Sequence, residues 1–278
     1  HLLEKDTKAE IKGIIPVNLA GRSVDMEAFR KLADEFGCWI IEDACHSPGG
    51  YFENSFGDKI KSGSGRYADL AIFSFHPVKH IAAGEGGMIT TNDRHLYERL
   101  KLLRTHGIVK VSSKFLSDSI NKVNTYPKWY MEMQVLGYNY RLSDIQAALG
   151  LSQLKRAEEG VEKRRVIAKK YYELFKDEIF ILGQSGIVVG HAYHLYIIQV
   201  KERNELYEYL KKENIFTQVH YIPIHLQPYY RAMGWKKGMF PVVEEYYSKT
   251  LTLPIYPSLS NLEQKRIIDL IRCFYSNE

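Results

Sequence analysis

The stretch "IKGIIPVNLAGRSVDMEAFRKLADEFGCWIIED", residues 11–43, has two short apolar runs with a helical pattern between them. The runs at 11–17 and 38–43 have the apolar, β-branched composition of buried strands. Asp25 can cap the start of the intervening helix and Gly37 its end. Apolar residues recur there at the spacing of one helix face: Met26, Phe29, Leu32 and Phe36. A strand, a helix and a strand in this order predict a βαβ unit, and therefore a parallel sheet.

The following segments predict a hairpin, two strands and a helix. Residues 47–67 are polar and glycine-rich, which is typical of a hairpin or an ordered loop. Residues 68–75 are apolar at nearly every position, so we expect a strand covered on both faces of the sheet. Residues 87–91 predict another strand. A helix then follows from a cap at Asn92 to an end at Gly107.

A long helix is predicted after the irregular segment 109–136. Ser143 can cap this helix, which we expect to run to about residue 176 with a break near Gly160. Alternating strand and helix patterns follow toward the end of the chain. The strands are expected at 193–200 and 215–222, and the helices at 202–214 and from Asn261 onward.

These patterns together predict an α/β protein with two domains. A large domain with a mixed, mostly parallel sheet is expected at residues 1–150. The linking helix and a smaller α+β domain are expected at residues 151–278. The chain shows no internal repeat and no low-complexity segment.

Composition excludes several classes of function. The net charge of +5 comes from Lys and Arg spread along the chain, whereas nucleic-acid binding requires a basic stripe of one sign. The count of 3 cysteines, with no CxxC pair, argues against a disulfide framework or a zinc knuckle and fits a reducing, cytoplasmic environment. No apolar run approaches the length of a membrane span, and the charged start is unlike a signal peptide.

Two chemically active side chains follow predicted neighbouring strands. Asp43 ends one strand, and Lys79 comes just after the apolar run 68–75 and before the glycine-rich "GEGG". Alone, Asp43 could cap a helix and Lys79 could be an ordinary solvated lysine. Together they fit pyridoxal phosphate, which needs a lysine for its Schiff base and an acid for its ring nitrogen. An apolar setting keeps the lysine amine neutral often enough to react, and glycines allow close approach of backbone and cofactor.

Other polar residues have structural explanations that compete with functional ones. Ser74 could donate to a phosphate oxygen, but taken alone a buried serine bonded to backbone is the better explanation. His76 and His80 have the spacing of a helical zinc pair, yet Pro77 between them argues against a regular helix and therefore against a metal site.

Five motifs, in order along nearly the whole chain, resemble the DegT/StrS family of sugar aminotransferases. The motifs are "EDACHS" (42–47), "FSFHPVKHIAAGEGGMITTND" (73–93), "GYNYRLSDIQAALGLSQL" (137–154), "VHYIPIHLQPYY" (219–230) and "LPIYPSLS" (253–260). The resemblance implies a fold-type I pyridoxal-phosphate enzyme that acts on nucleotide-linked keto sugars. The "FSFHPVK" segment is most similar to the branch that makes a 4-amino sugar nucleotide on the pseudaminic acid pathway.

The resemblance also implies roles for individual residues. Lys79 is expected to form the Schiff base, Asp43 to pair with the pyridinium nitrogen, and His46 to contact the ring oxygen of the cofactor. Ser74 is expected to bind the phosphate. Asn139 matches an asparagine that reaches the phosphate from the partner subunit, which implies a homodimer with shared active sites.

The loop after residue 218 is the expected substrate region. His220, Tyr221 and His225 lie in a stretch rich in His, Pro and Tyr. A packed aromatic loop would explain this composition equally well. The resemblance favours a role for these three side chains in lining the sugar-nucleotide pocket.

Three departures from the family pattern bear on the site. Family chains begin well before the point that corresponds to His1, so we expect the large domain to lack its N-terminal part, including a helix N-terminus that cradles the phosphate. Ala82 and Ala83 stand where close relatives often have Thr, and Asn18 stands where many have His. None of these positions changes the Lys79–Asp43 pair.

The resemblance therefore implies an aminotransferase that moves an amino group from an amino acid, expected to be glutamate, to a 4-keto-6-deoxy nucleotide sugar. Lys79 would act as general acid and base. Two alternatives remain open: a sugar dehydratase of the same family, whose members carry histidine in place of this lysine, and a non-catalytic fragment that binds nucleotide sugar.

Overall fold

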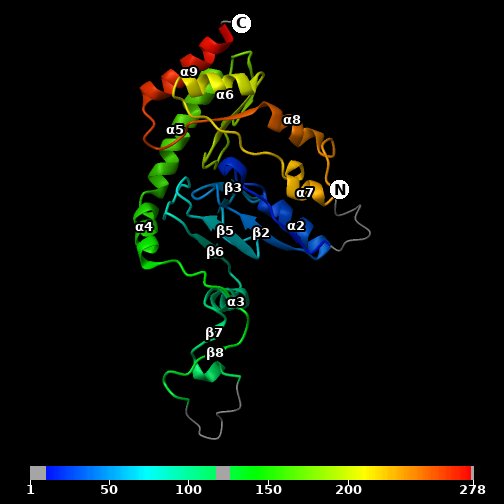
Figure 1. The fold of residues 1–278 in the computed structure, drawn as a ribbon, viewed down its shortest axis with the longest axis vertical. Coiled ribbons are helices and arrows are strands. Elements are labelled where there is room, and N and C mark those ends of the chain that lie inside the picture. The colour runs from blue at the N-terminus through cyan, green and yellow to red at the C-terminus, as the bar shows by residue number, and fades with distance from the viewer. Residues whose placement is uncertain (1–10, 117–125, 277–278) are drawn as a thin grey trace.

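The computed structural model describes residues 11–116 and 126–276 (Figure 1). Its first sheet has the strand order β1-β2-β5-β6, with β1 at Gly13–Ile14, β2 at Trp39–Asp43, β5 at Leu70–Ser74 and β6 at Gly87–Thr90. The first three strands are parallel, and β6 is antiparallel to β5. The predicted mixed, mostly parallel sheet is confirmed.

The βαβ unit forms as predicted because both ends of its helix are capped. In α2 (Met26–Phe36), the Asp25 carboxylate accepts a hydrogen bond from the Ala28 N–H at 3.0 Å. Gly37 ends the helix with φ of 65°, a left-handed conformation that glycine adopts without a steric penalty. The buried face of α2 packs on β2 through Met26 and Ala33, as part of a cluster with Ile40.

Two predictions about the next elements are wrong. In β5 only Ala71 is fully buried, and the other residues, two of which line a cavity of about 980 Å³, are half-buried, so the strand is not completely covered. The helix α3 (Arg94–Arg104) is capped by Asp93, whose carboxylate accepts from two backbone N–H groups. The side-chain amide of Asn92, the predicted cap, instead donates to the Ser64 carbonyl in the loop between β4 and β5.

Two hairpins flank this sheet. The predicted hairpin at 47–67 is present, with β3 at Tyr51–Glu53 and β4 at Lys59–Lys61. A second pair, β7 (Ile108–Val109) and β8 (Glu132–Met133), extends past α3 at the lower end of Figure 1, with the short helix η2 at Ser112–Lys114. Part of the segment predicted as irregular, residues 117–125, lies outside the described residues.

The long linking helix is two helices, α4 (Asp144–Leu154) and α5 (Ala157–Phe175). Ser143 caps α4 as predicted, in a capping box with Gln146. The break falls at Arg156, whose φ of −108° and ψ of 2° are not helical, so the predicted break near Gly160 is wrong. Figure 1 shows α4 and α5 running along one side of the molecule from the first sheet to the second.

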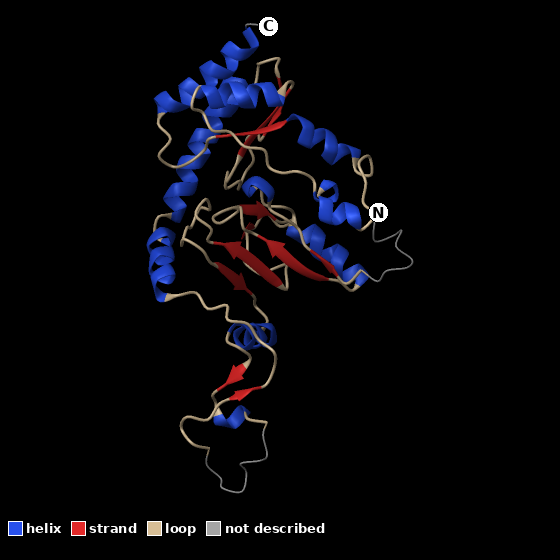
Figure 2. Cartoon of the chain, in the orientation of Figure 1, coloured by secondary structure: helices blue, strands red, loops and turns tan. Residues whose placement is uncertain are grey.

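The second sheet is antiparallel, with the order β11-β10-β9: β9 at Ile181–Gln184, β10 at Tyr196–Val200 and β11 at Thr250–Leu253. Helices α5, α6 (Arg203–Lys212) and α9 (Asn261–Ser276) enclose the largest cluster of buried side chains with this sheet (Figure 2). The predicted strand at 215–222 is wrong: only a single bridge, Gln218 to Thr252, forms there. Strand β9 was not predicted.

The loop after residue 222 carries short helices that the sequence did not predict. They are η4 (Ile224–Leu226), α7 (Pro228–Ala232) and α8 (Pro241–Lys249). Within residues 11–116 and 126–276, none of the helices combines the length and the apolar character needed to cross a membrane.

Two contacts tie the segment before β10 to the rest of the chain. The buried guanidinium of Arg164, on α5, donates to the carbonyls of Tyr193, His194 and Ile255 at 3.2, 3.3 and 2.8 Å. The short helix η1 (Leu19–Gly21) accepts from the N–H of Ala192 at 2.9 Å and of Leu195 at 3.1 Å. This segment is therefore held against the carboxyl edge of the first sheet.

Candidate active site

Asp43 and Lys79 lie at the same edge of the first sheet. Asp43 is the last residue of β2, and it pairs in register with Ile72 of the neighbouring parallel strand β5. Lys79 follows β5 in a turn closed by its own N–H donating to the His76 carbonyl at 2.9 Å. Since ligands of open α/β sheets bind at the carboxyl ends of the strands, both side chains occupy the expected position.

The Lys79 amine is electrostatically coupled to Asp43. Burial lowers the pKa of Lys79, and the nearby Cys45 and Asp43 partly oppose this shift. The N–H of Cys45 donates to the Asp43 carboxylate at 3.0 Å. Burial, helped by the hydrogen bond and charge of Asp43, raises the pKa of the Cys45 thiol to about 12. A lysine with a lowered pKa has a larger neutral fraction, which is the form that attacks a carbonyl carbon.

His46 lies beside this pair and is neutral. Its ring is 8% exposed, and its Nδ1 accepts a hydrogen bond from the Ala20 N–H at 3.3 Å. Burial, together with the charge of Lys79, lowers the pKa of His46 to about 4. The ring packs against His194 in a tilted arrangement, with 4.4 Å between centroids, and lies nearly parallel to the ring of Tyr221 at 6.3 Å.

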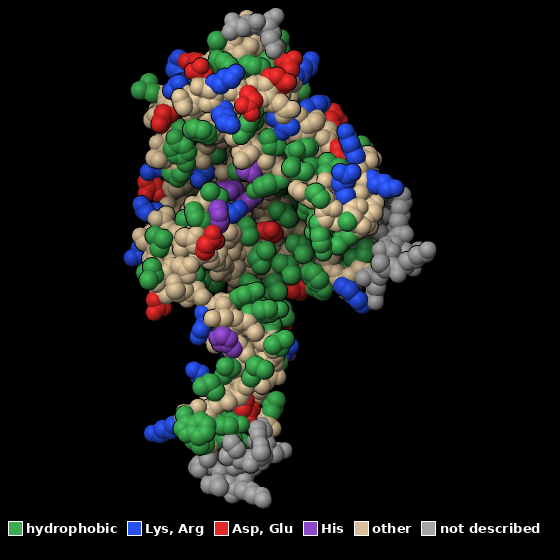
Figure 3. Space-filling model, viewed as in Figure 1, with side chains coloured by type: hydrophobic (Ala, Val, Ile, Leu, Met, Phe, Trp, Pro, Cys, Tyr) green, Lys and Arg blue, Asp and Glu red, His purple; other side chains and the backbone are tan. Residues whose placement is uncertain are grey.

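His220 and Tyr221 reach the same place from the loop after α6. The Nδ1 of His220 is 2.8 Å from the Thr252 hydroxyl, which anchors the loop to β11. Burial and then the charge of Lys79 lower the pKa of His220, whereas burial and then Asp43 raise that of Tyr221. Figure 3 shows histidine side chains gathered beside a cationic side chain in a hollow of the surface. We call the group Asp43, His46, Lys79, His220 and Tyr221 the Lys79 site.

Three predicted site residues make other contacts. The Nε2 of His225 is 2.8 Å from the Glu244 carboxylate, and its ring packs on Phe240, so this side chain is engaged with α8. Asn139 is exposed; it bridges to Thr105 after α3 and accepts from Arg141 at 3.1 Å. Ser74 is at the end of β5, where its hydroxyl accepts from the His76 N–H at 3.3 Å.

The glycines after Lys79 serve backbone packing. A side chain on Gly87 would meet the Phe73 carbonyl of β5 at 2.8 Å, and one on Gly86 would meet Leu142 at 2.7 Å. Gly87 therefore allows β6 to approach β5, and Gly86 makes room for Leu142 of the segment before α4. The expected close approach of this backbone to a cofactor stays a prediction.

Two further histidines, His194 and His80, lie beside the Lys79 site, and neither of them was assigned to it from the sequence. His194, which is 6% exposed, contacts both His46 and His80, the latter with 5.4 Å between ring centroids. The Nδ1 of His80 is 3.3 Å from the Pro48 carbonyl. His194 Nδ1 and His80 Nε2 are buried without a hydrogen-bond partner. Within the described part of the chain, no group of metal-ligating side chains is arranged to hold a metal ion.

Buried neutral histidines predict that the protein loses stability in mild acid. Burial lowers the pKa of His46 to about 4 and that of His191 to about 3, from 6.5. The unfolded chain therefore binds more protons below pH 6.5, and stability falls as the pH drops from 6.5 toward these values. At pH 5 each such histidine costs about 2 kcal/mol relative to pH 7.5.

Urea unfolding at pH 7.5 and 5 measures this effect. In His191→Asn, the difference in unfolding free energy between the two pH values should shrink by about 2 kcal/mol. His95→Asn, on the exposed surface of α3, is the matched control and should leave the difference unchanged. An equal pH dependence in the wild type and His191→Asn would contradict the neutral state of His191.

The sequence and the fold match a known class of enzymes. A family model described as the DegT/DnrJ/EryC1/StrS aminotransferase family matches residues 1–272. The chain therefore belongs to this family of aminotransferases. The UDP-4-amino-4,6-dideoxy-N-acetyl-beta-L-altrosamine transaminase of Helicobacter pylori is 33% identical to it over 267 residues, which cover 94% of this chain and 65% of the relative.

Solved structures with the same fold include two aminotransferases. Helicobacter pylori PseC, an aminotransferase involved in the biosynthesis of pseudoaminic acid, superposes with a TM-score of 0.84 at 30% identity, over 99% of this chain and 70% of that one. The PLP form of the putative sugar aminotransferase Spr1654 from Streptococcus pneumoniae gives a TM-score of 0.79 at 28% identity, over 98% and 70% of the two chains. The predicted fold-type I architecture is confirmed.

The residues present fit the ring end of pyridoxal phosphate. The cofactor requires a lysine amine for its Schiff base and an acid for its ring nitrogen. Lys79 has a lowered pKa, Asp43 lies close enough to influence it, and His46 is held uncharged beside both. This set of side chains is therefore suited to the cofactor on which the family depends.

Proposed function

We propose that this aminotransferase uses pyridoxal phosphate to move an amino group from an amino acid, glutamate, to a 4-keto-6-deoxy nucleotide sugar. The observation that carries the proposal is the position of the half-buried Lys79 amine, whose pKa is lowered. This amine lies at the same carboxyl edge of the first sheet as Asp43 and His46. The sugar-nucleotide substrate is supported by the name of the Helicobacter pylori relative, which acts on a UDP-linked amino sugar.

Four residues would hold the cofactor. Lys79 would bind its aldehyde carbon, Asp43 its ring nitrogen, His46 its ring oxygen and Ser74 its phosphate. Bound there, pyridoxal phosphate would supply the electron sink that amino-group transfer requires.

The protein side chains would then control protons and water. The Nζ of Lys79, kept partly neutral by burial, would take and return a proton as general base and acid. The Asp43 carboxylate would hold a positive charge opposite to it. Tyr221 and His220 would cover the site from the second sheet and limit the entry of water. His80, with its pKa lowered by burial to about 3 and its ring against His194, is not arranged to replace Lys79 as the base.

We also propose that two copies of the chain share their active sites through Asn139. This residue is exposed on the segment between β8 and α4, where it contacts Thr105 and Arg141. An exposed asparagine there is free to reach the site of a second copy. We keep the division into domains at residues 1–150 and 151–278 as part of the same proposal.

The proposal is tested with the full-length protein, pyridoxal phosphate, glutamate and a UDP-linked 4-keto-6-deoxy sugar. We expect an amino-sugar nucleotide and one 2-oxoglutarate for each product molecule, measured by mass spectrometry. A deoxygenated sugar without net amino transfer would support the dehydratase alternative. Binding of the nucleotide sugar without any turnover would support the non-catalytic alternative.

A further inference from the structure

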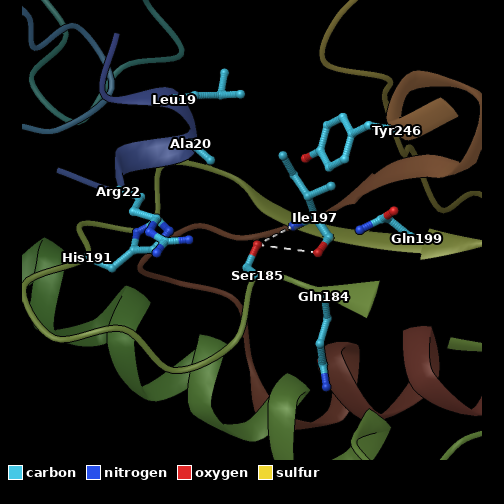
Figure 4. Close-up of a pocket in the computed structure, with 9 residues that line it drawn as sticks. All are labelled: Leu19, Ala20, Arg22, Gln184, Ser185, His191, Ile197, Gln199 and Tyr246. Carbon is cyan, nitrogen blue, oxygen red and sulfur yellow. Dashed lines mark hydrogen bonds between the residues drawn. The ribbon is translucent and has the colours of Figure 1, made fainter. Parts of the chain in front are cut away.

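A separate cavity of about 330 Å³ is lined by two residues of η1, Leu19 and Ala20 (Figure 4). Its walls come from η1 and the adjoining Arg22, from β9 and β10, and from α8 through Tyr246. Neither Lys79 nor Asp43 lines it. Its volume is at the lower end of the range for small-molecule sites, so it suits a ligand of a few heavy atoms.

The polar side chains of this cavity can donate hydrogen bonds, and one of them carries a positive charge. Arg22 is the cation, and the lining residues include no carboxylate. Among the described residues, the side chains of Arg22, Gln199 and Tyr246 have no hydrogen-bond partner. The Nδ1 of His191 accepts from the Tyr193 N–H at 2.8 Å, which leaves the ring proton on Nε2 as a further donor.

The remaining polar groups are already satisfied, and the rest of the wall is apolar. The Ser185 hydroxyl bonds to both backbone groups of Ile197, as the dashed lines in Figure 4 show, and the Gln184 amide accepts from Tyr196. The apolar lining comes from Leu19, Ala20 and Ile197. A guanidinium with neutral donors favours an oxyanion, and the apolar wall favours a short carbon chain attached to it.

We propose that this cavity binds a short aliphatic carboxylate, with the carboxylate group on Arg22 and the carbon chain against Leu19 and Ile197. The site would communicate with the Lys79 site, because Ala20 lines the cavity and donates its N–H to His46. Ala20 has the unusual φ of 61°, and its carbonyl accepts a hydrogen bond from the Leu195 N–H. A displacement of η1 would therefore shift both His46 and the segment that enters the second sheet. This inference does not rest on the proposed amino transfer.

The test is an NMR titration of the cofactor-loaded full-length protein with succinate, at constant ionic strength, that follows the ring signals of His191. These signals, assigned with His191→Asn, report on this cavity and not on the Lys79 site. We expect a saturable shift in the wild type. In Arg22→Gln the affinity should fall roughly tenfold or more, because a hydrogen bond to a charged group is lost. Arg22 is exposed, so this variant should fold normally, which circular dichroism checks.

Arg66→Gln is the matched control, since Arg66 is exposed and pairs with Asp58 on the β3–β4 hairpin. It should bind succinate like the wild type. Three outcomes would overturn the proposal: no shift of His191, an unchanged affinity in Arg22→Gln, or an equal loss in Arg66→Gln. Inorganic phosphate is titrated in parallel. A saturable response to phosphate with none to succinate would contradict a carboxylate site.

Discussion

Replacing Lys79 by alanine is expected to lower kcat for amino transfer by at least about 10²- to 10⁴-fold, the range that a positioned acid–base group contributes. The variant should also lose the visible absorption of the covalently bound cofactor. The physical reason is that the half-buried amine, whose pKa burial lowers, would both hold the cofactor and move the proton. Steady-state kinetics and absorption spectroscopy of the purified variant measure the two effects.

Lys79→Arg separates charge from chemistry. Its guanidinium keeps a positive charge beside Asp43 but stays protonated, so it should be as inactive as the alanine variant. Lys212→Ala, on the exposed side of α6, is the control and should keep both activity and absorption. Appreciable activity in Lys79→Arg would assign the essential proton transfer to another group.

Replacing Asp43 by asparagine is expected to lower kcat/KM by about 10²- to 10³-fold, as removal of one preorganised electrostatic partner does in other enzymes. Asparagine has nearly the same shape, so the change removes mainly the negative charge that would face the ring nitrogen. Kinetics with saturating cofactor measure the loss. Asp34→Asn, an exposed carboxylate of α2 paired with Arg30, should have no effect.

The same variant has a second readout that does not depend on activity. The hydrogen bond and charge of Asp43 help to raise the pKa of the Cys45 thiol to about 12. Without that charge the thiol pKa should fall, and alkylation of Cys45 at alkaline pH should become faster. Mass spectrometry of the alkylated peptide measures the rate. An unchanged alkylation profile together with unchanged kinetics would show that Asp43 does not act at this site.

Local patterns predicted the elements that depend on neighbouring residues. The caps at Asp25, Gly37 and Ser143 form as expected, because capping is decided within one turn of helix. The cap of α3 was misplaced by one residue, since Asn92 and Asp93 are both suitable and only the carboxylate is aligned with two free N–H groups. The break between α4 and α5 was attributed to a glycine, but Gly160 continues the helix.

Tertiary contacts explain the remaining differences in the fold. Residues 215–222 have the composition of a strand, yet only Gln218 pairs with β11, and the loop then turns toward the first sheet. The free edge of β10 pairs with β9, a short strand whose sequence, "ILGQ", contains a glycine. Strand composition does not specify which neighbour supplies the hydrogen bonds, so these pairings could not be predicted from the sequence.

The candidate site was predictable only where the sheet topology orders it. Asp43 and Lys79 follow parallel neighbouring strands, which is why their proximity could be inferred. His194 comes from the turn before β10, and it reaches His46 because Arg164 and η1 hold that turn in place. No local pattern marks such a contact between distant segments.

The most direct test of the central claim, that Lys79 is the amine that holds the cofactor, is peptide mapping after borohydride reduction of the protein loaded with pyridoxal phosphate. The account predicts one phosphopyridoxyl group per chain, on the peptide that contains Lys79, and a loss of that label in Lys79→Ala. Stoichiometric labelling of a different lysine, or label spread over many lysines with none enriched at Lys79, would contradict it.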